Sequence, residues 1–252
     1  MLNHQTSEQL RRLKLTGMAL GFEEQLKQPQ IQTLSFEERF GLIVDREWTF
    51  RENRRLKRLL KSARLREAAC LEDIDYRQRR GLQPAVVRSL ASGQWITLHQ
   101  NVIIIGPTGS GKTYLACALA HQACRQGFTA RYLRIPKLLQ DLQLAKADGS
   151  YAKLLAKLAK LNLLLLDDWG LTPLNPAERR DLLEILDDRY NRASTLITSQ
   201  FPIASWHEAI GDPTIADAIL DRLIHQAHKI TLKGESMRKI HSSLTQPDSP
   251  GV

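Results

Sequence analysis

The sequence predicts an α/β protein, in which a core with a parallel β-sheet is preceded by a small all-helical domain. Two observations lead to this fold class. From about residue 82, short apolar runs alternate with helical patterns, which is typical of βαβ units around a parallel sheet. Residues 1–80 instead carry apolar side chains at roughly helical spacing, as between Leu10 and Leu26.

The helical region has a recognisable start signal and a predicted end. Residues 35–38 read Ser-Phe-Glu-Glu, a capping box that should begin a helix running beyond Val44. Gly81 and Pro84 then break the helical pattern. We therefore expect a helical domain over 1–80, a separate core over 81–243 and a disordered tail over 244–252.

The segment 51–66 is strongly basic, and Glu52 is its only acidic residue. Its leucines leave an apolar stripe, so positive charge would cover most of the exposed surface of a helix. A solvated helix face usually mixes both signs in pairs four residues apart. We therefore predict contacts with nucleic-acid phosphates, with a solvated or protein-binding face as the alternative. The candidate residues are Arg51, Arg54, Arg55, Lys57, Arg58, Lys61 and Arg64.

Composition supports a polyanionic partner and excludes several classes of protein. The 252 residues include 36 basic and 27 acidic side chains, for a net charge of +9. The three cysteines show no C-x-x-C spacing, which argues against a disulfide framework or a structural zinc site. No signal peptide or membrane-length apolar run is present. We expect a cytoplasmic protein that does not contact a membrane.

The core is predicted to contain five strands. Between the second and third strands, two short helices are expected at 136–147 and 150–160. The second of them places Lys153, Lys157 and Lys160 on one face, which is either a further DNA-facing surface or an ordinary amphipathic helix. The predicted strands are 101–105, 130–135, 162–166, 194–198 and 228–232.

A phosphate-binding loop follows the first predicted strand. Residues 106–113 match the pattern G-x-x-x-x-G-K-[ST] at every fixed position, between a strand-like run and a helix-forming segment. Such a loop points its N–H groups at phosphates, with Lys112 on the β- and γ-phosphates and Thr113 on Mg²⁺. ATP and Mg²⁺ are thus the expected cofactors. The predicted contacts are Gly106, Pro107, Thr108, Gly109, Ser110, Gly111, Lys112, Thr113 and Tyr114.

Polar side chains at the ends of two later strands predict the hydrolytic half of the site. Asp167 and Asp168 end an apolar run, and we assign Asp167 to Mg²⁺ and Asp168 to the attacking water. The alternative is a helix cap at a strand–helix turn. Gln200 ends the next strand and is the first candidate to hold the water, with Ser199 or Thr198 as alternatives and a plain turn as the simplest interpretation.

Taken together, these segments resemble the IstB family of insertion-sequence helper ATPases, AAA+ proteins related to the DnaC helicase loader. The resemblance covers roughly residues 5–243, and its most specific parts are GESMR and the basic WTFRENRR. The matching segments read FEERF, DREWTFRENRRL, GPTGSGKTYLA, LLLLDDWG, TSQ, ILDRL and KGESMRK.

The resemblance implies an AAA+ core whose ATP site lies between subunits of a homo-oligomer. It assigns Arg222 as an arginine finger supplied in trans and Arg238 as a second sensor. It also implies ATP-dependent assembly on duplex DNA and partnership with a transposase. Asp168 stands where many AAA+ proteins carry Glu, which predicts slow hydrolysis, and Gln200 stands where related loaders often carry Asn.

Three functions are compatible with the sequence. The preferred one is a DNA-binding ATPase that regulates transposition, assembled by ATP and released by hydrolysis. The alternative is a helicase loader that touches single strands, for which Trp48, Phe50 and Tyr76 are the few stacking candidates. A small-molecule kinase is disfavoured, because it needs neither the basic helix nor a partner arginine.

Overall fold

The computed structural model describes residues 2–77, 80–234 and 236–237, so the predicted tail lies outside the described residues. The chain forms two compact units, Met1–Arg58 and Leu59–Val252. The expected division at residue 80 therefore differs from this one, because residues 59–80 belong to the second unit.

The first unit is built from helices. The predicted capping box begins α3: the Ser35 N–H donates to Glu38 Oε2 at 2.8 Å, and the Glu38 N–H donates to Ser35 Oγ at 3.2 Å. Helices α2 and α3 meet at Gly17, where a Cβ would lie only 2.6 Å from Cα of Glu47. The elements are α1 (Leu2–Arg12), α2 (Thr16–Leu26), η1 (Pro29–Thr33) and most of α3 (Phe36–Ala63).

Helix α3 ends at Ala63, so the helical region is shorter than the predicted 1–80. Arg64 has a φ of 50°, in the left-handed region that a right-handed helix cannot use. From there to α4 (Pro84–Ala91), no described residue lies in a helix or strand. The side chains of Arg66 and Arg80 in this segment instead contact the phosphate-site region, as described below.

The second unit contains a five-stranded parallel sheet in the order β2-β3-β4-β1-β5. All five predicted strands are confirmed, and the largest difference is that β3 continues to Trp169. The strands are β1 (Asn101–Ile105), β2 (Ala130–Arg134), β3 (Leu163–Trp169), β4 (Ser194–Ser199) and β5 (Ala227–Thr231).

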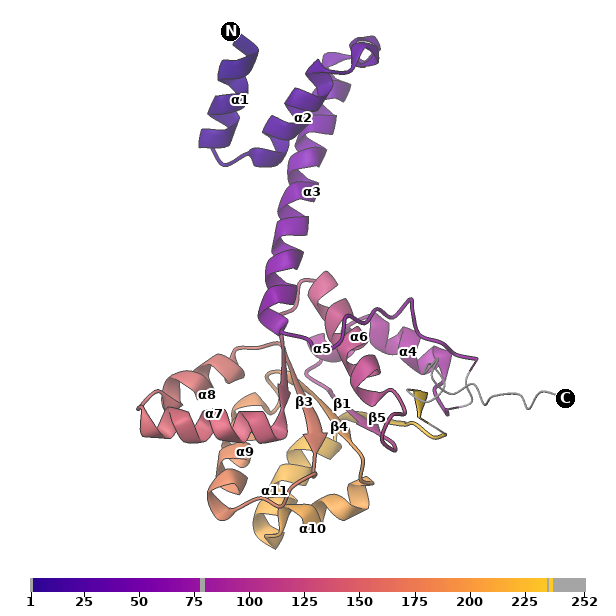
Figure 1. The fold of residues 1–252 in the computed structure, drawn as a ribbon, viewed down its shortest axis with the longest axis vertical. Coiled ribbons are helices and arrows are strands. Elements are labelled where there is room, and N and C mark those ends of the chain that lie inside the picture. The colour runs from indigo at the N-terminus through magenta and orange to yellow at the C-terminus, as the bar shows by residue number, and fades with distance from the viewer. Residues whose placement is uncertain (1, 78–79, 235, 238–252) are drawn as a thin grey trace, which may run out of the picture. The chain divides into compact units, whose positions relative to one another are not determined.

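Helices cover both faces of the sheet. Figure 1 shows α6 on one face and α7, α8, α9 and α11 on the other, as right-handed crossovers require for this strand order. The two predicted helices between β2 and β3 are confirmed as α7 and α8. The helices are α5 (Gln94–Thr97), α6 (Lys112–Arg125), α7 (Ile135–Ala147), α8 (Tyr151–Ala159), α9 (Pro176–Arg189), η2 (Ile203–Ser205), α10 (Trp206–Ile210) and α11 (Pro213–Ile224).

One large apolar cluster lies between the sheet and the face covered by α7, α9 and α11. Leu164, Leu166 and Ile197 of the middle strands are fully buried against apolar side chains of α7, α9 and α11, among them Leu142 and Ile219. Burial of this apolar surface is the main stabilising contribution to the unit. Within the described ranges, no helix combines the length and apolarity needed to cross a membrane.

One buried arginine connects three elements of this unit. Arg189, in the last turn of α9, is 1% exposed. Its guanidinium donates to the carbonyl oxygens of Leu158 and Leu161 at 2.6 and 2.9 Å, to that of Ser194 at 2.5 Å and to Thr195 Oγ1 at 3.3 Å. Burial lowers the pKa of Arg189 to about 10. Arg189 thus provides donors for hydrogen-bond acceptors near the end of α8 and at the start of β4.

Replacement of Arg189 by methionine is expected to lower the free energy of unfolding by about 3 kcal/mol, because buried acceptors lose their donor. Urea denaturation followed by circular dichroism measures this change. The matched control is Arg192→Met in the exposed turn that follows α9, expected to shift the free energy by less than about 0.5 kcal/mol. Equal effects of the two substitutions would contradict the assigned role of Arg189.

Candidate nucleotide site

The glycine-rich loop lies between the carboxyl end of β1 and the start of α6, in the predicted strand–loop–helix setting (Figure 1). Gly109 and Gly111 have φ values of 82° and 92°, which favour glycine. A Cβ on Gly109 would lie 2.1 Å from Oγ of Ser236. Since α6 begins at Lys112, the N–H groups of its first turn, which no helix carbonyl accepts, add to those of the loop.

Lys112 lies inside the curl of this loop. It is 8% exposed, and its Nζ donates to the carbonyl oxygens of Gly106 at 2.7 Å and Pro107 at 2.8 Å. A buried ammonium with three donors can exchange such contacts for phosphate oxygens. The position therefore suits the predicted contact with the β- and γ-phosphates.

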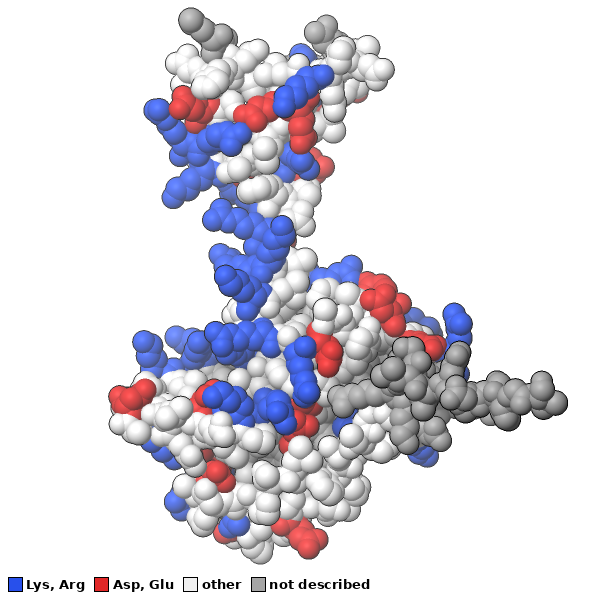
Figure 2. Space-filling model, in the orientation of Figure 1, with Lys and Arg blue, Asp and Glu red and all other residues white. Residues whose placement is uncertain are grey.

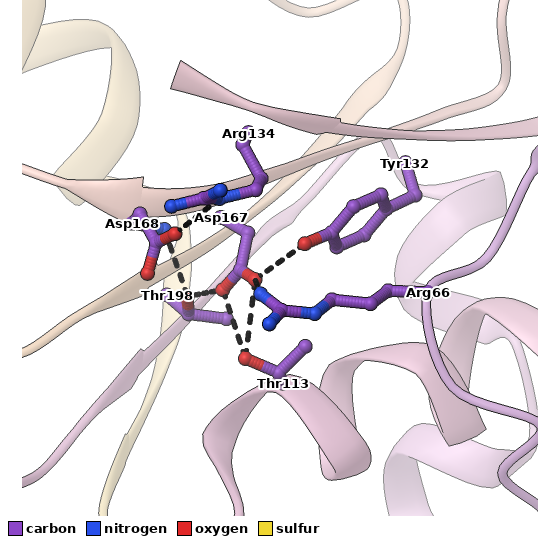
Figure 3. A network of polar contacts seen from close by, with 7 residues as sticks. All are labelled: Arg66, Thr113, Tyr132, Arg134, Asp167, Asp168 and Thr198. Atoms are coloured by element: carbon purple, nitrogen blue, oxygen red, sulfur yellow. Dashed lines mark hydrogen bonds and ion pairs between the residues drawn. The ribbon is translucent and has the colours of Figure 1, made fainter. Parts of the chain in front are cut away.

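Asp167 is the centre of a buried network at the end of β3 (Figure 3). It is 1% exposed, and both of its carboxylate oxygens lie 3.1 Å from Thr113 Oγ1. The hydroxyls of Tyr132, at 2.7 Å, and Thr198 also donate to it. Burial and the contact with this carboxylate raise the pKa of Tyr132. The predicted pair of Thr113 and Asp167 is thus brought together by α6 and β3.

The oxygen pair of Thr113 and Asp167 fits a magnesium ion that also binds phosphates. Mg²⁺ is usually held by one or two carboxylates, with substrate phosphates and waters completing the octahedron. Within the described ranges, no group of three or more His, Cys, Asp and Glu residues could hold a metal by protein ligands alone. The residues therefore suit a metal that arrives with a nucleotide.

Asp168 points away from Asp167 toward β2. Its Oδ2 forms an ion pair with Nε of Arg134 at 2.6 Å, and its N–H lies 3.4 Å from Thr198 Oγ1 (Figure 3). Its φ of 65° accompanies a shift in strand register between Leu166 and Trp169. Such an irregularity changes the direction of a side chain relative to the regular alternation of a strand. The carboxylate of Asp168 is 19% exposed and reachable by water.

The polar residues Thr198, Ser199 and Gln200, at the end of β4 and just after it, contact different parts of the site. The Gln200 Oε1 accepts a hydrogen bond from Thr108 Oγ1 of the phosphate loop at 2.7 Å. Thr198 lies between the carboxylate of Asp167 and the N–H of Asp168, whereas Ser199 donates to a backbone carbonyl. Gln200 is therefore beside the loop and Thr198 beside the acids. Which of them holds the water stays a prediction.

A pocket of about 400 Å³ adjoins the loop on the side of Tyr114. Arg80 forms part of its wall: it is 8% exposed, donates to the Ser110 carbonyl at 3.4 Å and to that of Asp75 at 3.0 Å. Its Nε has no hydrogen-bond partner in the described part of the chain. The volume lies in the range of small-ligand sites. The remaining lining residues are Glu67, Asp73, Gly109, Gly111, Lys112, Thr113 and Met237.

Arg222 lies at the opposite edge of the sheet from the phosphate loop. It is in the last turn of α11, where it forms an ion pair with Asp187 and donates to the Ala218 carbonyl at 2.8 Å. Its own carbonyl accepts from Nδ2 of Asn101, the first residue of β1, at 3.0 Å. The structure thus does not bring Arg222 to the loop that follows the end of β1. Arg238 lies outside the described residues.

The exposed side of the second half of α3 is basic, and Figure 2 shows Lys and Arg gathered along it. Two of the candidate DNA contacts have acidic partners: Arg51 pairs with Glu47 at 2.6 Å, and Arg55 with Glu52 at 3.8 Å. The others are exposed and form no ion pair within the described ranges, namely Arg54, Lys57, Arg58, Lys61 and Arg64. Arg64 follows the helix rather than lying on it.

Helix α8 is amphipathic, as predicted. Leu155 and Leu158 are buried, whereas Lys153, Lys157 and Lys160 are exposed. The structure is compatible with both interpretations of this lysine face.

Sequence reasoning missed Arg66, Arg80, Tyr132 and Arg134. Only Arg134 had an available signal: β2 and β3 pair in parallel with Arg134 opposite Asp167, so the end of β2 faces the acids. Arg66 ends the basic segment 51–66, Tyr132 lies on the predicted strand 130–135 and Arg80 precedes Gly81, but none of these positions indicates a role at the site, and only the tertiary structure places them there.

Two solved structures share this fold. The crystal structure of DnaI superposes with a TM-score of 0.58 at 22% identity, covering 66% of this chain and 91% of that chain. The structure of the DnaC helicase loader gives a TM-score of 0.52 at 21% identity, covering 59% and 87%. These similarities establish the AAA+ P-loop fold.

Sequence comparison identifies the family. The family model described as IstB-like ATP binding protein matches residues 8–245. The insertion sequence ATP-binding protein y4pL of Sinorhizobium fredii is 52% identical over 239 residues, which are 95% of this chain and 98% of that protein. The chain therefore belongs to the IstB-like family of insertion-sequence ATP-binding proteins and is an ATPase.

Proposed function

We propose that this protein is an ATP-dependent, DNA-binding regulator of transposition that assembles on duplex target DNA and recruits or stimulates a transposase. The observation that carries the proposal is the separation of the predicted hydrolytic residues. Lys112 and Asp167 lie at one edge of the sheet, and Arg222 lies at the other. A complete site then needs Arg222 from another copy, so that bound ATP joins subunits.

Each residue of the site has a proposed role in hydrolysis. Lys112, the loop N–H groups and the start of α6 bind the phosphates, while Thr113 and Asp167 hold Mg²⁺. When bound, the ion would supply positive charge that stabilises the negative charge of the phosphates. Asp168 orients the attacking water and accepts its proton, with Thr198 or Gln200 positioning that water. The pocket beside Tyr114 is of suitable size for the adenine ring of ATP.

The basic half of α3 is the proposed DNA surface. Arg54, Lys57, Arg58 and Lys61 are exposed and form no ion pair within the described ranges, so they suit phosphates. They offer no obvious set of base-reading side chains, which predicts weak sequence preference. The transposase partner is proposed because relatives such as y4pL are named for insertion sequences.

The test is a mobility shift of a labelled duplex with ATP, with ADP and without nucleotide. We expect the tightest binding with ATP, and equal affinities in all three conditions would contradict assembly by ATP. Changing Arg54 and Arg58 together to glutamine should reduce the salt dependence of DNA binding: the slope of the logarithm of the DNA association constant against the logarithm of the salt concentration should become less steep by about two. The matched control changes Arg88 and Arg192 together to glutamine, because both are exposed but lie outside α3.

A helicase loader remains the second candidate, because Trp48 is 68% exposed and Tyr76 is 39% exposed. Exposed aromatic side chains beside basic residues suit stacking with single-stranded bases. Competition between single-stranded and duplex DNA of equal length separates the two functions. Preference for the duplex supports the transposition regulator, and preference for single strands supports the loader.

Arg222→Ala is expected to bind ATP normally but to lose most hydrolysis, because charge on the transferring phosphoryl group loses its partner arginine. Mixing Arg222→Ala with Asp168→Asn should restore part of the activity. In some interfaces of the mixed assembly, the intact Asp168 of an Arg222→Ala subunit then lies next to the intact Arg222 of an Asp168→Asn subunit, which gives a complete site. Phosphate release of the mixture measures this. A mixture no more active than its separate components would contradict a site shared between subunits.

A further inference from the structure

Arg66, the last residue of the basic segment 51–66, lies beside the candidate metal ligands. It follows the end of α3 by three residues, and its Nη1 is 4.0 Å from Oδ2 of Asp167. The guanidinium also lies close to the hydroxyl of Tyr132, and the interaction with this hydroxyl, together with the charge of Asp167, raises the pKa of Arg66. Figure 3 shows the side chain pointing at Asp167, with Thr113 approaching the same carboxylate from α6.

Asp167 is a buried carboxylate that needs a nearby cation. The hydroxyls of Thr113, Tyr132 and Thr198 contact it, but hydroxyls carry no formal charge. Within the described ranges, Arg66 is the only Lys or Arg that forms an ion pair with Asp167. An unpaired buried charge is strongly destabilising. Arg66 therefore balances this carboxylate in the protein without nucleotide.

We propose that Arg66 is an internal counter-ion that competes with Mg²⁺ for Asp167 and thereby sets the metal affinity of the nucleotide site. This inference rests on the proposed function, since it requires Thr113 and Asp167 to be metal ligands. Two cations beside one carboxylate repel each other, so each lowers the affinity of the site for the other. The Arg66 side chain is 43% exposed and is free to move into solvent.

Arg66 also connects the metal site to the end of α3. The carbonyl of Ser62 accepts a hydrogen bond from Nη1 of Arg131 at 3.0 Å, and Ala63 is fully buried. Arg131 and Tyr132 are neighbours on β2. Residues 62–66 are thus held to β2 by Arg131 at one end and by Arg66 at the other. Withdrawal of Arg66 on metal binding releases the second of these contacts.

The first test is Mn²⁺ binding at saturating ADP, followed by the electron paramagnetic resonance signal of free Mn²⁺. R66Q should bind Mn²⁺ about fivefold more tightly than the wild type, because a half-exposed competing cation is removed. R66K keeps the charge and should stay near the wild type. R88Q, an exposed arginine of α4, is the control. An R66Q affinity equal to or weaker than that of the wild type would overturn the proposal.

The second test is hydrogen exchange of residues 59–66, with and without Mn²⁺ and ADP. Exchange should rise on binding in the wild type and should already be high and unresponsive in R66Q. No response in the wild type would overturn the connection to α3. Failure of the proposed nucleotide site has a different signature, because the wild type would then bind no ADP. Normal ADP binding with unshifted Mn²⁺ affinity overturns the role of Arg66 alone.

Discussion

Replacement of Lys112 by alanine is expected to weaken ATP binding by about a hundredfold or more. The ammonium lies inside the phosphate loop, within hydrogen-bond distance of two loop carbonyls, and alanine supplies neither charge nor donors there. Isothermal titration with ATP measures the loss.

The control for this change is Lys153→Ala, which removes an exposed lysine of α8 and should leave ATP affinity unchanged. Circular dichroism shows whether Lys112→Ala is folded, since the substitution also removes the lysine's contacts with the Gly106 and Pro107 carbonyls. A folded Lys112→Ala protein with wild-type ATP affinity would refute the assignment of this loop as the phosphate site.

Replacement of Asp168 by asparagine is expected to leave ATP binding intact and to slow hydrolysis by at least about a hundredfold. The amide has nearly the same shape but cannot accept the proton of the attacking water. It also loses the ion pair with Arg134, which is 2.6 Å from the carboxylate. Single-turnover phosphate release measures the rate, and particle mass with ATP and duplex DNA shows whether the assembled state accumulates.

Asp141→Asn provides the matched control, because Asp141 is a partly exposed carboxylate of α7 paired with Lys137 and lies outside the site. Its hydrolysis rate should match that of the wild type. If Asp168→Asn hydrolysed ATP at the rate of this control, Asp168 would not be the base, and another group would have to activate the water.

Much of the fold could be predicted because its signals are local. The strand β1 is a continuous apolar run, and such runs suit strands buried on both faces of a parallel sheet. The start of α3 is set by Ser35 and Glu38, which satisfy each other's N–H groups within one turn. The end of α3 was predicted less well. Arg64 adopts a left-handed backbone, which basic residues in a helical pattern do not reveal.

The chemistry of the phosphate site is encoded locally in the sequence. Glycines at 109 and 111 permit the curl, and Lys112 and Thr113 follow at fixed spacing, so one short segment contains the whole loop. The surroundings of Asp167 depend instead on how the chain folds. Arg66 and Tyr132 come from separate elements, and the fold brings them to the carboxylate. A buried charge takes its partners from residues that are close in space, and sequence distance does not record that proximity.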